Sequence, residues 1–466
     1  MSSRKEHDFI GELEIDDSVY YGIQTFRATQ NFKFSDRKLK DYPFFIKAFA
    51  QIKKAAALTN AKVGVLPHEI AQALAAAADR VIAGELREQF VVDMIQGGAG
   101  TSTNMNVNEV LTNLALEIKG HKKGEYEYIH VNDHANLGQS TNDTYPSAIK
   151  VATCAILGEL EGALNGLVAA LEAKESEFKD VIKMGRTELE DAVPTTLGNS
   201  FGAFAASIKS SLEQITQTKN LMKILNLGGT AIGTGINCHP LYKDEVHKKL
   251  SEIVGESFKP ALNLISATQD TADFAQVSGS VKTLAIRLSK IANDLRLMNS
   301  GPRCGLGEIN LPQMQPGSSI MPGKINPVIA EVVLIAANQI IAYDTAIMLN
   351  SKGGEFELNA LEPGIAYALF DMITLAINAT NTLREKAISG LSANVKECER
   401  QVLNSVGIVT AFNPYLGYEK SASIAKEALD TGKSVGEIVK ERGYLSKKEI
   451  EEILNPKNML NPTMVK

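Results

Sequence analysis

The segment from Gly317 to Asn326 carries more groups that could do chemistry than any other stretch of this chain. Its sequence, GSSIMPGKIN, holds two hydroxyls, one ammonium and one carboxamide together with two glycines. Neither helix nor strand periodicity accounts for these residues, and glycines allow a loop to swing and to approach a ligand closely. Although a Gly/Ser/Pro cluster is usually a plain surface connection, this polar content predicts a loop that brings a reactive serine, Ser318, to a small anionic substrate and closes over it.

A phosphate-binding loop is the main competing interpretation, because Gly317, Gly323 and Lys324 partly match the pattern GxxxxGK[ST]. The match fails at two points, since five residues separate the glycines and Ile325 stands where the pattern requires a hydroxyl for the metal ion. The sequence therefore does not predict a nucleotide site.

Three further segments are rich in hydroxyl and amide side chains. They are GGAGTSTNMN from Gly97, NLGQSTND from Asn136 and MGRTELEDAVP from Met184. Each one alone fits a helix cap or a turn, positions that Ser, Thr, Asn and Asp favour. Together with the loop they provide many hydrogen-bond donors that do not titrate, which suits a site for a small anionic substrate.

Size and composition are those of an ordinary globular enzyme. The chain has 466 residues, of which 44% are hydrophobic and 22% charged, and a net charge of -6. This length can bury a large core in two or three structural units, and the acidic balance gives no electrostatic footprint for nucleic acid or an anionic membrane. The N-terminal sequence lacks the apolar segment of a signal peptide, and no uninterrupted apolar run reaches the ~18 residues of a membrane span. We therefore expect a cytoplasmic protein that binds neither membrane nor nucleic acid.

The four cysteines, Cys154, Cys238, Cys304 and Cys398, are far apart and form no CxxC pair, so neither a disulfide framework nor a zinc site is expected. Cys238 and His239 could suggest a nucleophilic pair, but adjacent residues rarely face each other and the proline that follows indicates a turn. No cluster of His, Asp and Glu has the spacing of metal ligands, so we expect no metal site.

Most of the chain shows helical periodicity. Apolar residues recur every three or four positions from Phe201 to Ile215 and from Leu284 to Met298. From Glu331 to Leu349 and from Ile365 to Ile377 the sequence is apolar on more than one face, so these helices must be buried on several sides, in a bundle or between subunits. Short strand-like runs, such as residues 18–21, occur near the N-terminus, and the charged C-terminal tail is helical. The sequence predicts a mainly α protein.

Taken in the order of the chain, the four polar segments resemble the signature regions of the aspartase/fumarase superfamily. The resemblance extends from Arg4 to about Asn461. Members of this superfamily eliminate fumarate from a substituted succinate. The resemblance implies a mainly α, three-domain fold in which a central bundle of long helices is shared between the subunits of a homotetramer. It places an N-terminal domain at residues 1–140, the central bundle domain at 141–395 and a small C-terminal helical domain at 396–466.

The resemblance also assigns roles to ten polar residues. Ser318 matches the general base, which removes the proton next to a carboxylate and generates an enediolate. Because a serine hydroxyl is a poor base, backbone N–H groups and Lys324 must lower its pKa. The implied substrate-binding residues are those for the carboxylate beside the acidic C–H (Thr101, Ser140, Thr141 and Ser319), those for the other carboxylate (Thr187, Lys324 and Asn326), and those near the leaving group (Asn142 and Glu188).

The residues after the loop favour the aspartase branch over the fumarases. The sequence NPVIAEVV from Asn326 to Val333 is similar to the aspartase continuation NPVIPEVV, and fumarases differ there. Glu188 departs from the pattern, since the superfamily usually has His or Gln at that position. An ionised carboxylate near the leaving group would pair with an ammonium and repel a third carboxylate, although Glu188 could instead form a structural salt bridge.

The resemblance therefore implies a reversible elimination of ammonia from L-aspartate to give fumarate. A class II fumarase-like hydratase, or an ammonia-lyase for another substituted succinate, is the alternative enzyme, and Glu188 leaves open whether plain L-aspartate is preferred. A catalytically silent helical scaffold is the non-enzyme alternative, which the presence of Ser318, Lys324, Asn326 and Thr101 disfavours. No cofactor is expected to be required, and the sequence does not show whether a divalent cation activates the protein.

Overall fold

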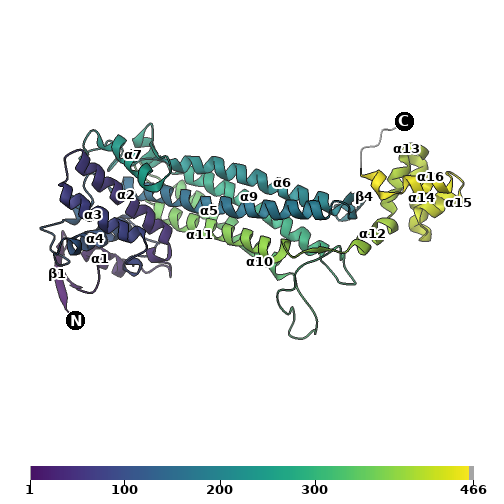
Figure 1. Ribbon diagram of the computed structural model, residues 1–466, viewed down its shortest axis with the longest axis horizontal. Helices are drawn as coiled ribbons and strands as arrows, with labels where there is room; N and C mark the ends of the chain where they lie inside the picture. The colour runs from purple at the N-terminus through teal and green to yellow at the C-terminus, as the bar shows by residue number, and fades with distance from the viewer. Residues whose placement is uncertain (1, 461–466) are drawn as a thin grey trace. The chain divides into compact units, whose positions relative to one another are not determined.

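The computed structural model describes residues 2–460 and confirms the mainly α class (Figure 1). The first α-helices are α1 (Ile23–Asn31), α2 (Pro43–Lys62), α3 (His68–Ile82), α4 (Thr101–Ile118), α5 (Thr141–Glu177), α6 (Leu197–Lys219), α7 (Tyr242–Val254) and α8 (Leu264–Gln269). The later ones are α9 (Ala272–Met298), α10 (Val328–Ser351), α11 (Glu362–Leu383), α12 (Val395–Asn404), α13 (Asn413–Leu416), α14 (Tyr418–Thr431), α15 (Val435–Glu441) and α16 (Lys447–Ile453). Short 3-10 or π-helical turns are η1 (Leu39–Asp41), η2 (Arg87–Gln89), η3 (Val131–Ala135), η4 (Asn220–Lys223), η5 (Arg384–Ile388), η6 (Val406–Phe412) and η7 (Pro456–Met459).

The strands of the described residues form four separate two-stranded sheets. Three are antiparallel pairs: β1 (Ser3–Asp8) with β2 (Gly11–Asp16), β3 (Ile182–Thr187) with β4 (Glu190–Thr196), and β7 (Ile309–Asn310) with β8 (Ser392–Ala393). The fourth pairs β5 (Ile224–Leu225) and β6 (Lys259–Pro260) in parallel. Because a two-stranded ribbon cannot bury a core of its own, the helices must supply it.

The strand-like run at residues 18–21 forms no strand, so that expectation was wrong. Two carbonyl groups of this run bond to a side chain and not to a neighbouring strand, because the Arg4 guanidinium donates to the carbonyls of Val19 and Tyr21 at 3.1 and 2.8 Å. It also donates to the carbonyl of Asp16, at the end of β2, at 3.0 Å. The Asp16 carboxylate also accepts the backbone N–H two residues further on at 2.8 Å, which turns the chain. The N-terminal hairpin lies earlier, at β1 and β2.

The chain divides into two compact units, which we call the first and the second unit. The first unit comprises Met1–Gly162, Glu213–Ala285 and Asn338–Ile377, and the second comprises Ala163–Leu212, Ile286–Ala337 and Asn378–Lys466. Five long helices, α5, α6, α9, α10 and α11, are continuous across this division, so each unit contains a part of each of them. The three-domain division expected from the sequence stays a prediction.

The first unit is built by helix packing, with α2, α3 and α4 against one another (Figure 1). The alanine-rich composition of α2 favours a helix, and Pro43 occupies its first turn, where the missing N–H has no helical partner to lose. An aromatic cluster joins α2 to α5 and α11. The ring of Phe45 lies 5.1 Å from that of Phe49, 5.6 Å from Tyr145 and 4.9 Å from Phe370. These buried rings fix the start of α5, directly after the polar segment NLGQSTND.

The second unit has a core in its C-terminal helices. Buried side chains from α12, α14, α15 and α16 surround Phe412 together with Met184 of β3. Ser434 and Ser446 begin α15 and α16 with capping boxes, each completed by a glutamate three residues later. The helical C-terminal tail predicted from the sequence is confirmed, and it packs on the hairpin formed by β3 and β4.

The long periodic segments form helices as predicted. On α6 and α9, the apolar repeats from Phe201 to Ile215 and from Leu284 to Met298 supply buried residues. On α10, however, Val332, Ile335 and Met348 are 48%, 61% and 51% exposed. By length and composition alone, α5 and α10 could each cross a membrane, but a core helix of a soluble protein passes the same test, and 50% of the apolar window of α5 is buried. Exposed apolar residues gathered on one helix mark an interaction surface.

Candidate active site

Two helices of the first unit begin at residues that the sequence predicts to bind substrate. Thr101 is the first residue of α4, and its hydroxyl donates to Gly98 O at 2.8 Å. Thr141 is the first residue of α5, and its hydroxyl accepts a hydrogen bond from the Asn104 amide of α4 at 3.2 Å. This bond holds the N-terminal turns of α4 and α5 next to each other, with a threonine at the start of both.

Gly100 makes the close approach of these two helices possible. It is the residue before α4 and has a φ of +90°, a left-handed conformation that favours glycine. A Cβ on this residue would overlap the ring of Tyr145 on α5, well inside the 3.0 Å that real Cβ atoms keep from their neighbours. Glycine at position 100 is therefore required by packing as well as by backbone conformation.

Ser140 and Asn142 flank Thr141 at the start of α5. Ser140 N donates to Asp143 Oδ1 at 2.9 Å, and the Ser140 hydroxyl accepts from Asn142 N at 3.2 Å. The Asn142 amide donates to Ala231 O at 2.7 Å, in the glycine-rich loop that contains Gly228. Both residues are half-buried, so a ligand can reach them. The structure thus brings them together with the two threonines.

A buried lysine and a buried aspartate support the turn before α5, and neither was predicted. Lys53 Nζ donates to Asn136 Oδ1 at 3.1 Å and to Gln139 Oε1 at 2.9 Å, while the Asp143 carboxylate accepts from Gly228 N at 2.9 Å. Burial lowers the pKa of Lys53 to about 7 and raises the pKa of Asp143 to about 6, and each charge partly offsets the shift of the other. Asp143 stands inside the motif NLGQSTND, which is a usable signal, whereas nothing in the sequence marks Lys53.

The two adjacent helix N-termini favour a bound anion. The first turns of α4 and α5 contain backbone N–H groups without helical partners, and the helix dipoles add partial positive charge there. The hydroxyl and amide side chains at both ends add donors that carry no charge of their own. A carboxylate, and even more the doubly charged enediolate derived from it, is the ligand that this arrangement would stabilise.

The loop from Gly317 to Asn326 forms neither helix nor strand, which confirms the sequence-based expectation. Its two ends are tied together, because Gly317 N donates to Lys324 O at 2.7 Å and the Asn326 amide donates to Gly317 O at 2.8 Å. A Cβ on Gly317 would lie 2.7 Å from Asn326 N, so only glycine fits at this closure. Residues 319–325 are exposed beyond the closed base.

Ser318 lies at the base of this loop, where two backbone donors face its side chain. Its hydroxyl oxygen accepts from Ile320 N at 3.2 Å and from Met321 N at 2.9 Å. Donors aimed at one oxygen stabilise negative charge on it, which a serine needs in order to act as a base. The side chains of Ser319 and Lys324 are exposed and have no hydrogen-bond or ion-pair partner within residues 2–460.

Thr187 and Glu188 lie at the tip of the hairpin formed by β3 and β4, in the second unit. Thr187 pairs with Glu190, so Glu188 and Leu189 make a two-residue turn. Both have positive φ angles, +55° and +69°, in a type I′ pattern that asparagine and glycine normally supply. Other residues are strained in this conformation by roughly 1–2 kcal/mol each, and such strain persists where the surrounding structure enforces it.

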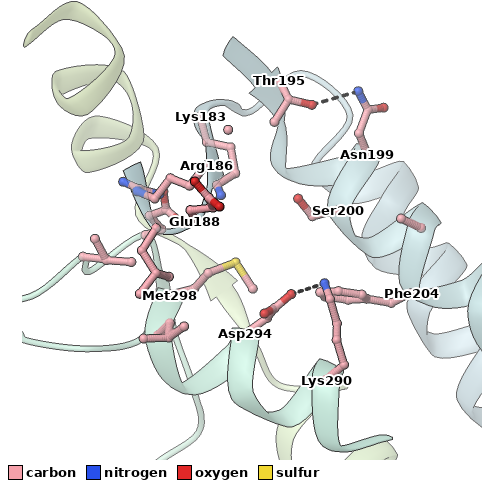
Figure 2. A pocket seen from close by; sticks show the side chains of 16 residues that line it. Lys183, Arg186, Glu188, Thr195, Asn199, Ser200, Phe204, Lys290, Asp294 and Met298 are labelled. Atoms are coloured by element: carbon pink, nitrogen blue, oxygen red, sulfur yellow. Dashed lines mark hydrogen bonds and ion pairs between the residues drawn. The ribbon is translucent and has the colours of Figure 1, made fainter. Parts of the chain in front are cut away.

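Glu188 lines a cavity of about 610 Å³ between the hairpin, the start of α6 and the end of α9. Figure 2 shows Lys183, Arg186 and Glu188 on the hairpin side of the cavity, and Lys290 and Asp294 on α9. The Glu188 side chain is exposed and has no hydrogen-bond or ion-pair partner in the described part of the chain. The structural salt bridge considered for Glu188 is therefore not formed with any residue between 2 and 460.

The structure also bears on the expected absence of a metal site and of a Cys/His nucleophilic pair. Among residues 2–460, no three His, Cys, Asp or Glu side chains gather as a metal site. The Cys238 thiol donates to Gly138 O at 2.8 Å and the His239 ring accepts from Leu241 N at 3.2 Å, so these neighbours do not form a nucleophilic pair. Burial raises the pKa of the Cys238 thiol to about 12, which keeps it protonated and unreactive.

The ten predicted site residues thus form three groups, one in the first unit and two in the second. The groups are the helix starts (Thr101, Ser140, Thr141 and Asn142), the hairpin tip (Thr187 and Glu188) and the loop (Ser318, Ser319, Lys324 and Asn326). What each residue does to a substrate stays a prediction.

Comparisons with known proteins cover the whole chain. A family model described as lyase matches residues 11–342, and one described as the fumarase C C-terminus matches residues 408–461. Aspartate ammonia-lyases similar to this chain include those of Helicobacter pylori strain J99, 53% identical over 98% of both chains, and Pseudomonas aeruginosa, 50% identical over 100% of this chain and 98% of the relative. That of Escherichia coli K12 is 46% identical over 98% of this chain and 96% of the relative.

Solved structures give the same result for the fold. A fumarate lyase:delta crystallin from Brucella melitensis, bound to cobalt, is 46% identical with a TM-score of 0.97, covering 99% of this chain and 100% of its own. A recombinant class II fumarase from Schistosoma mansoni is 32% identical with a TM-score of 0.94, covering 98% of this chain and 99% of its own. Agreement over the full length in both sequence and fold shows that this chain belongs to the aspartase/fumarase superfamily.

Proposed function

We propose that this chain is an aspartate ammonia-lyase, a carbon–nitrogen lyase that reversibly converts L-aspartate to fumarate and ammonia. The observation that carries this proposal is the similarity to aspartate ammonia-lyases of three bacteria, at 46–53% identity over at least 98% of this chain. The sequence NPVIAEVV after the loop, which is similar to the aspartase continuation, points the same way.

Ser318 is the proposed base. As an alkoxide it takes a proton from Cβ of aspartate, and the C–H electrons move into the adjacent carboxylate, which becomes an enediolate. The enediolate then returns these electrons to form the C=C bond, and the C–N bond breaks with its electron pair on the departing ammonia. The two backbone N–H donors at 2.9 and 3.2 Å from the Ser318 oxygen support this role, because they stabilise the alkoxide.

The carboxylate that becomes the enediolate would bind where α4 and α5 begin. The paired helix N-termini support this placement, since the charge on this carboxylate doubles during the reaction and the N–H groups are already oriented toward it. The residues proposed for this carboxylate are Thr101, Ser140, Thr141 and Ser319, and those proposed for the other carboxylate are Lys324, Asn326 and Thr187.

Glu188 and Asn142 would bind the departing amine. A carboxylate without an ion-pair partner in residues 2–460 is available for an ammonium group. A hydrogen bond to a charged group contributes roughly 1.5–3 kcal/mol, or about ten- to a hundredfold in affinity. The uncharged hydroxyl of L-malate would gain less from Glu188, so the amine-bearing substrate is preferred.

The active form is proposed to be a cytoplasmic homotetramer with sites shared between subunits, which requires no cofactor and binds neither nucleic acid nor membrane. Exposed apolar side chains along α10, such as Ile335 at 61%, support contacts with other copies. Sedimentation or light scattering tests the assembly, and a stable, active monomer would contradict it.

A direct assay tests the proposed activity. The purified protein is incubated separately with L-aspartate, L-malate and L-asparagine, and fumarate or fumaramate is followed by its ultraviolet absorbance. Rapid fumarate formation from L-aspartate, with little from L-malate, is the expected result. Preferential turnover of L-malate would indicate a hydratase, and turnover of L-asparagine alone would indicate an ammonia-lyase for another substituted succinate.

A further inference from the structure

Lys183 and Arg186 converge on one buried carboxylate because β3 is irregular. Successive residues of a strand point to opposite faces, so two residues three positions apart would face opposite sides of a regular strand. The pairing with β4 shifts register between Met184 and Arg186, which leaves Gly185 as a β-bulge. A Cβ on Gly185 would lie 2.7 Å from Val193 O, so this bulge requires glycine.

The shared carboxylate belongs to Glu308, which is 0% exposed. Lys183 Nζ lies 3.1 Å from its Oε2 and Arg186 Nη1 lies 2.6 Å from its Oε1, and a buried charge of this kind is tolerated only with such partners. Arg186 Nη2 also donates to Gln401 Oε1 at 2.7 Å, and Gln401 Nε2 donates to Leu306 O at 2.5 Å. We call Lys183, Arg186, Glu308 and Gln401 the hairpin clamp, because they fasten β3 to α12 and to the segment before β7.

The clamp adjoins the strained turn at the hairpin tip. Glu188 and Leu189, with φ angles of +55° and +69°, would relax toward ordinary backbone conformations if the hairpin were free. Arg186 precedes Glu188 by two residues, so holding the Arg186 guanidinium in place restrains the backbone that leads into the turn. Both terminal nitrogens of the Arg186 guanidinium already bond to Glu308 and Gln401. These bonds keep the guanidinium from pairing with the Glu188 carboxylate, which lines the same cavity.

We propose that Arg186 is a positioning residue: by holding Glu308 and Gln401, it keeps the turn strained and the Glu188 carboxylate unpaired, and so directs Glu188 to the amino group of the substrate. This inference rests on the proposed function, because it takes an amine-bearing succinate as the substrate. When the clamp is opened, the freed guanidinium can pair with Glu188 and neutralise it. The clamp thereby determines how well the enzyme binds the amine, although none of its four residues needs to touch substrate.

A double-mutant cycle tests this inference. In steady-state kinetics with L-aspartate, Glu188→Gln should raise KM by about ten- to a hundredfold, the value of a charge-assisted hydrogen bond. Glu308→Gln should raise KM by a comparable factor with a smaller change in kcat, and Glu308→Gln combined with Glu188→Gln should be no worse than the worse single variant. The inhibition constant of succinate, which has no amine, should stay unchanged in all three. Losses that multiply in the double variant would overturn the inference.

A milder substitution tests the same inference in case the Glu308→Gln protein does not fold. Gln401→Ala removes only one partner of Arg186 at a half-buried position, and it should raise KM for L-aspartate without changing the inhibition by succinate. Glu399→Ala is the matched control, because Glu399 is an exposed residue of α12 whose side chain has no hydrogen-bond or ion-pair partner within residues 2–460. Equal effects of Gln401→Ala and Glu399→Ala would mean that α12 does not act through Arg186.

The strain is measured without any substrate. Leu189→Gly places glycine at a positive φ and removes a side chain that is 70% exposed. Leu262→Gly is the control for the flexibility that glycine adds to the unfolded chain, since Leu262 is fully exposed and its φ is not positive. Relative to Leu262→Gly, Leu189→Gly should lower the unfolding equilibrium constant about five- to thirtyfold. A Leu189→Gly protein no more stable than Leu262→Gly would refute the strained turn. If the wild-type protein forms no fumarate from L-aspartate, the proposed function is wrong, and the role of Arg186 in directing Glu188 is wrong with it, whatever the stability result.

Discussion

Replacing Gly100 by alanine should disturb the start of α4 through both side-chain packing and backbone conformation. The new Cβ would overlap three ring atoms of Tyr145, which is 0% exposed and is held by Phe45 and Phe49, with ring centroids 5.6 and 5.9 Å away. Overpacking of this kind costs about 1–3 kcal/mol, and a non-glycine residue at positive φ costs roughly 1–2 kcal/mol more. We therefore expect Gly100→Ala to destabilise the fold by about 2–5 kcal/mol.

Gly120→Ala separates the two contributions. Gly120 has a similar φ of +83°, but no atom lies within 4 Å of the place that its Cβ would take, so only the backbone cost of roughly 1–2 kcal/mol applies. Urea unfolding of both variants gives the difference directly, at one fixed protein concentration because the proposed assembly would contribute to stability. Gly100→Ala should also lower kcat/KM by up to about a hundredfold, since it displaces Thr101. Equal destabilisation by the two substitutions would refute the packing argument.

Three further predictions concern the chemistry. Ser318→Ala should lower kcat by at least ~10²-fold with the assembly unchanged in light scattering, and near wild-type turnover would place the base elsewhere. Lys324→Met should lower kcat/KM strongly, because a substrate carboxylate would lose its cation, and an unchanged value would exclude Lys324 as the anchor. Since burial raises the pKa of Asp143 to about 6, kcat/KM should fall as pH drops below about 6, where protonation releases the backbone N–H groups of Gly228 and the turn before α5. Because the pKa of Asp143 is higher in the folded than in the unfolded protein, this group stabilises the fold most at a pH below its unfolded pKa, and that stabilisation is lost as pH rises through about 6. Acid unfolding through Asp143 therefore cannot explain such a fall in kcat/KM. Asp143→Asn should be less active than wild type above about pH 6 and lack this acid limb, and a wild-type acid limb in that variant would assign the limb to another group.

Local patterns in the sequence identified much of this molecule. The helical repeats predicted α6 and α9, and the polar content of the segment from Gly317 to Asn326 marked a loop without regular structure. These predictions succeed because a helix face or a glycine-rich loop is determined mainly by residues close together in the chain. Short polar motifs also indicated that Thr101 and Thr141 belong to a site, and the structure adds that both begin helices.

Local sequence patterns could not predict the contacts between residues far apart in the chain. Lys53 lies among alanines and would pass for a surface lysine, yet it is 3% exposed and bonds to residues more than 80 positions away. Arg186 and Glu308 are 122 positions apart, and their ion pair depends on a β-bulge that no spacing rule reveals. The strand-like run at residues 18–21 failed for a related reason, because a side chain from Arg4 took its carbonyl groups. Contacts of this kind depend on the tertiary fold and not on local periodicity.

The apolar face of α10 has a consequence for the life of a newly made chain. Val332 and Ile335 are 48% and 61% exposed in a single folded copy, so a monomer carries an exposed apolar surface that the proposed assembly would cover. Where assembly covers that face, the apparent melting temperature should rise with protein concentration. At low concentration, the proposed assembly would dissociate by mass action, and the sites shared between subunits would be lost with it. Dilution would thus inactivate this protein by a route that leaves every residue of the proposed active site chemically intact.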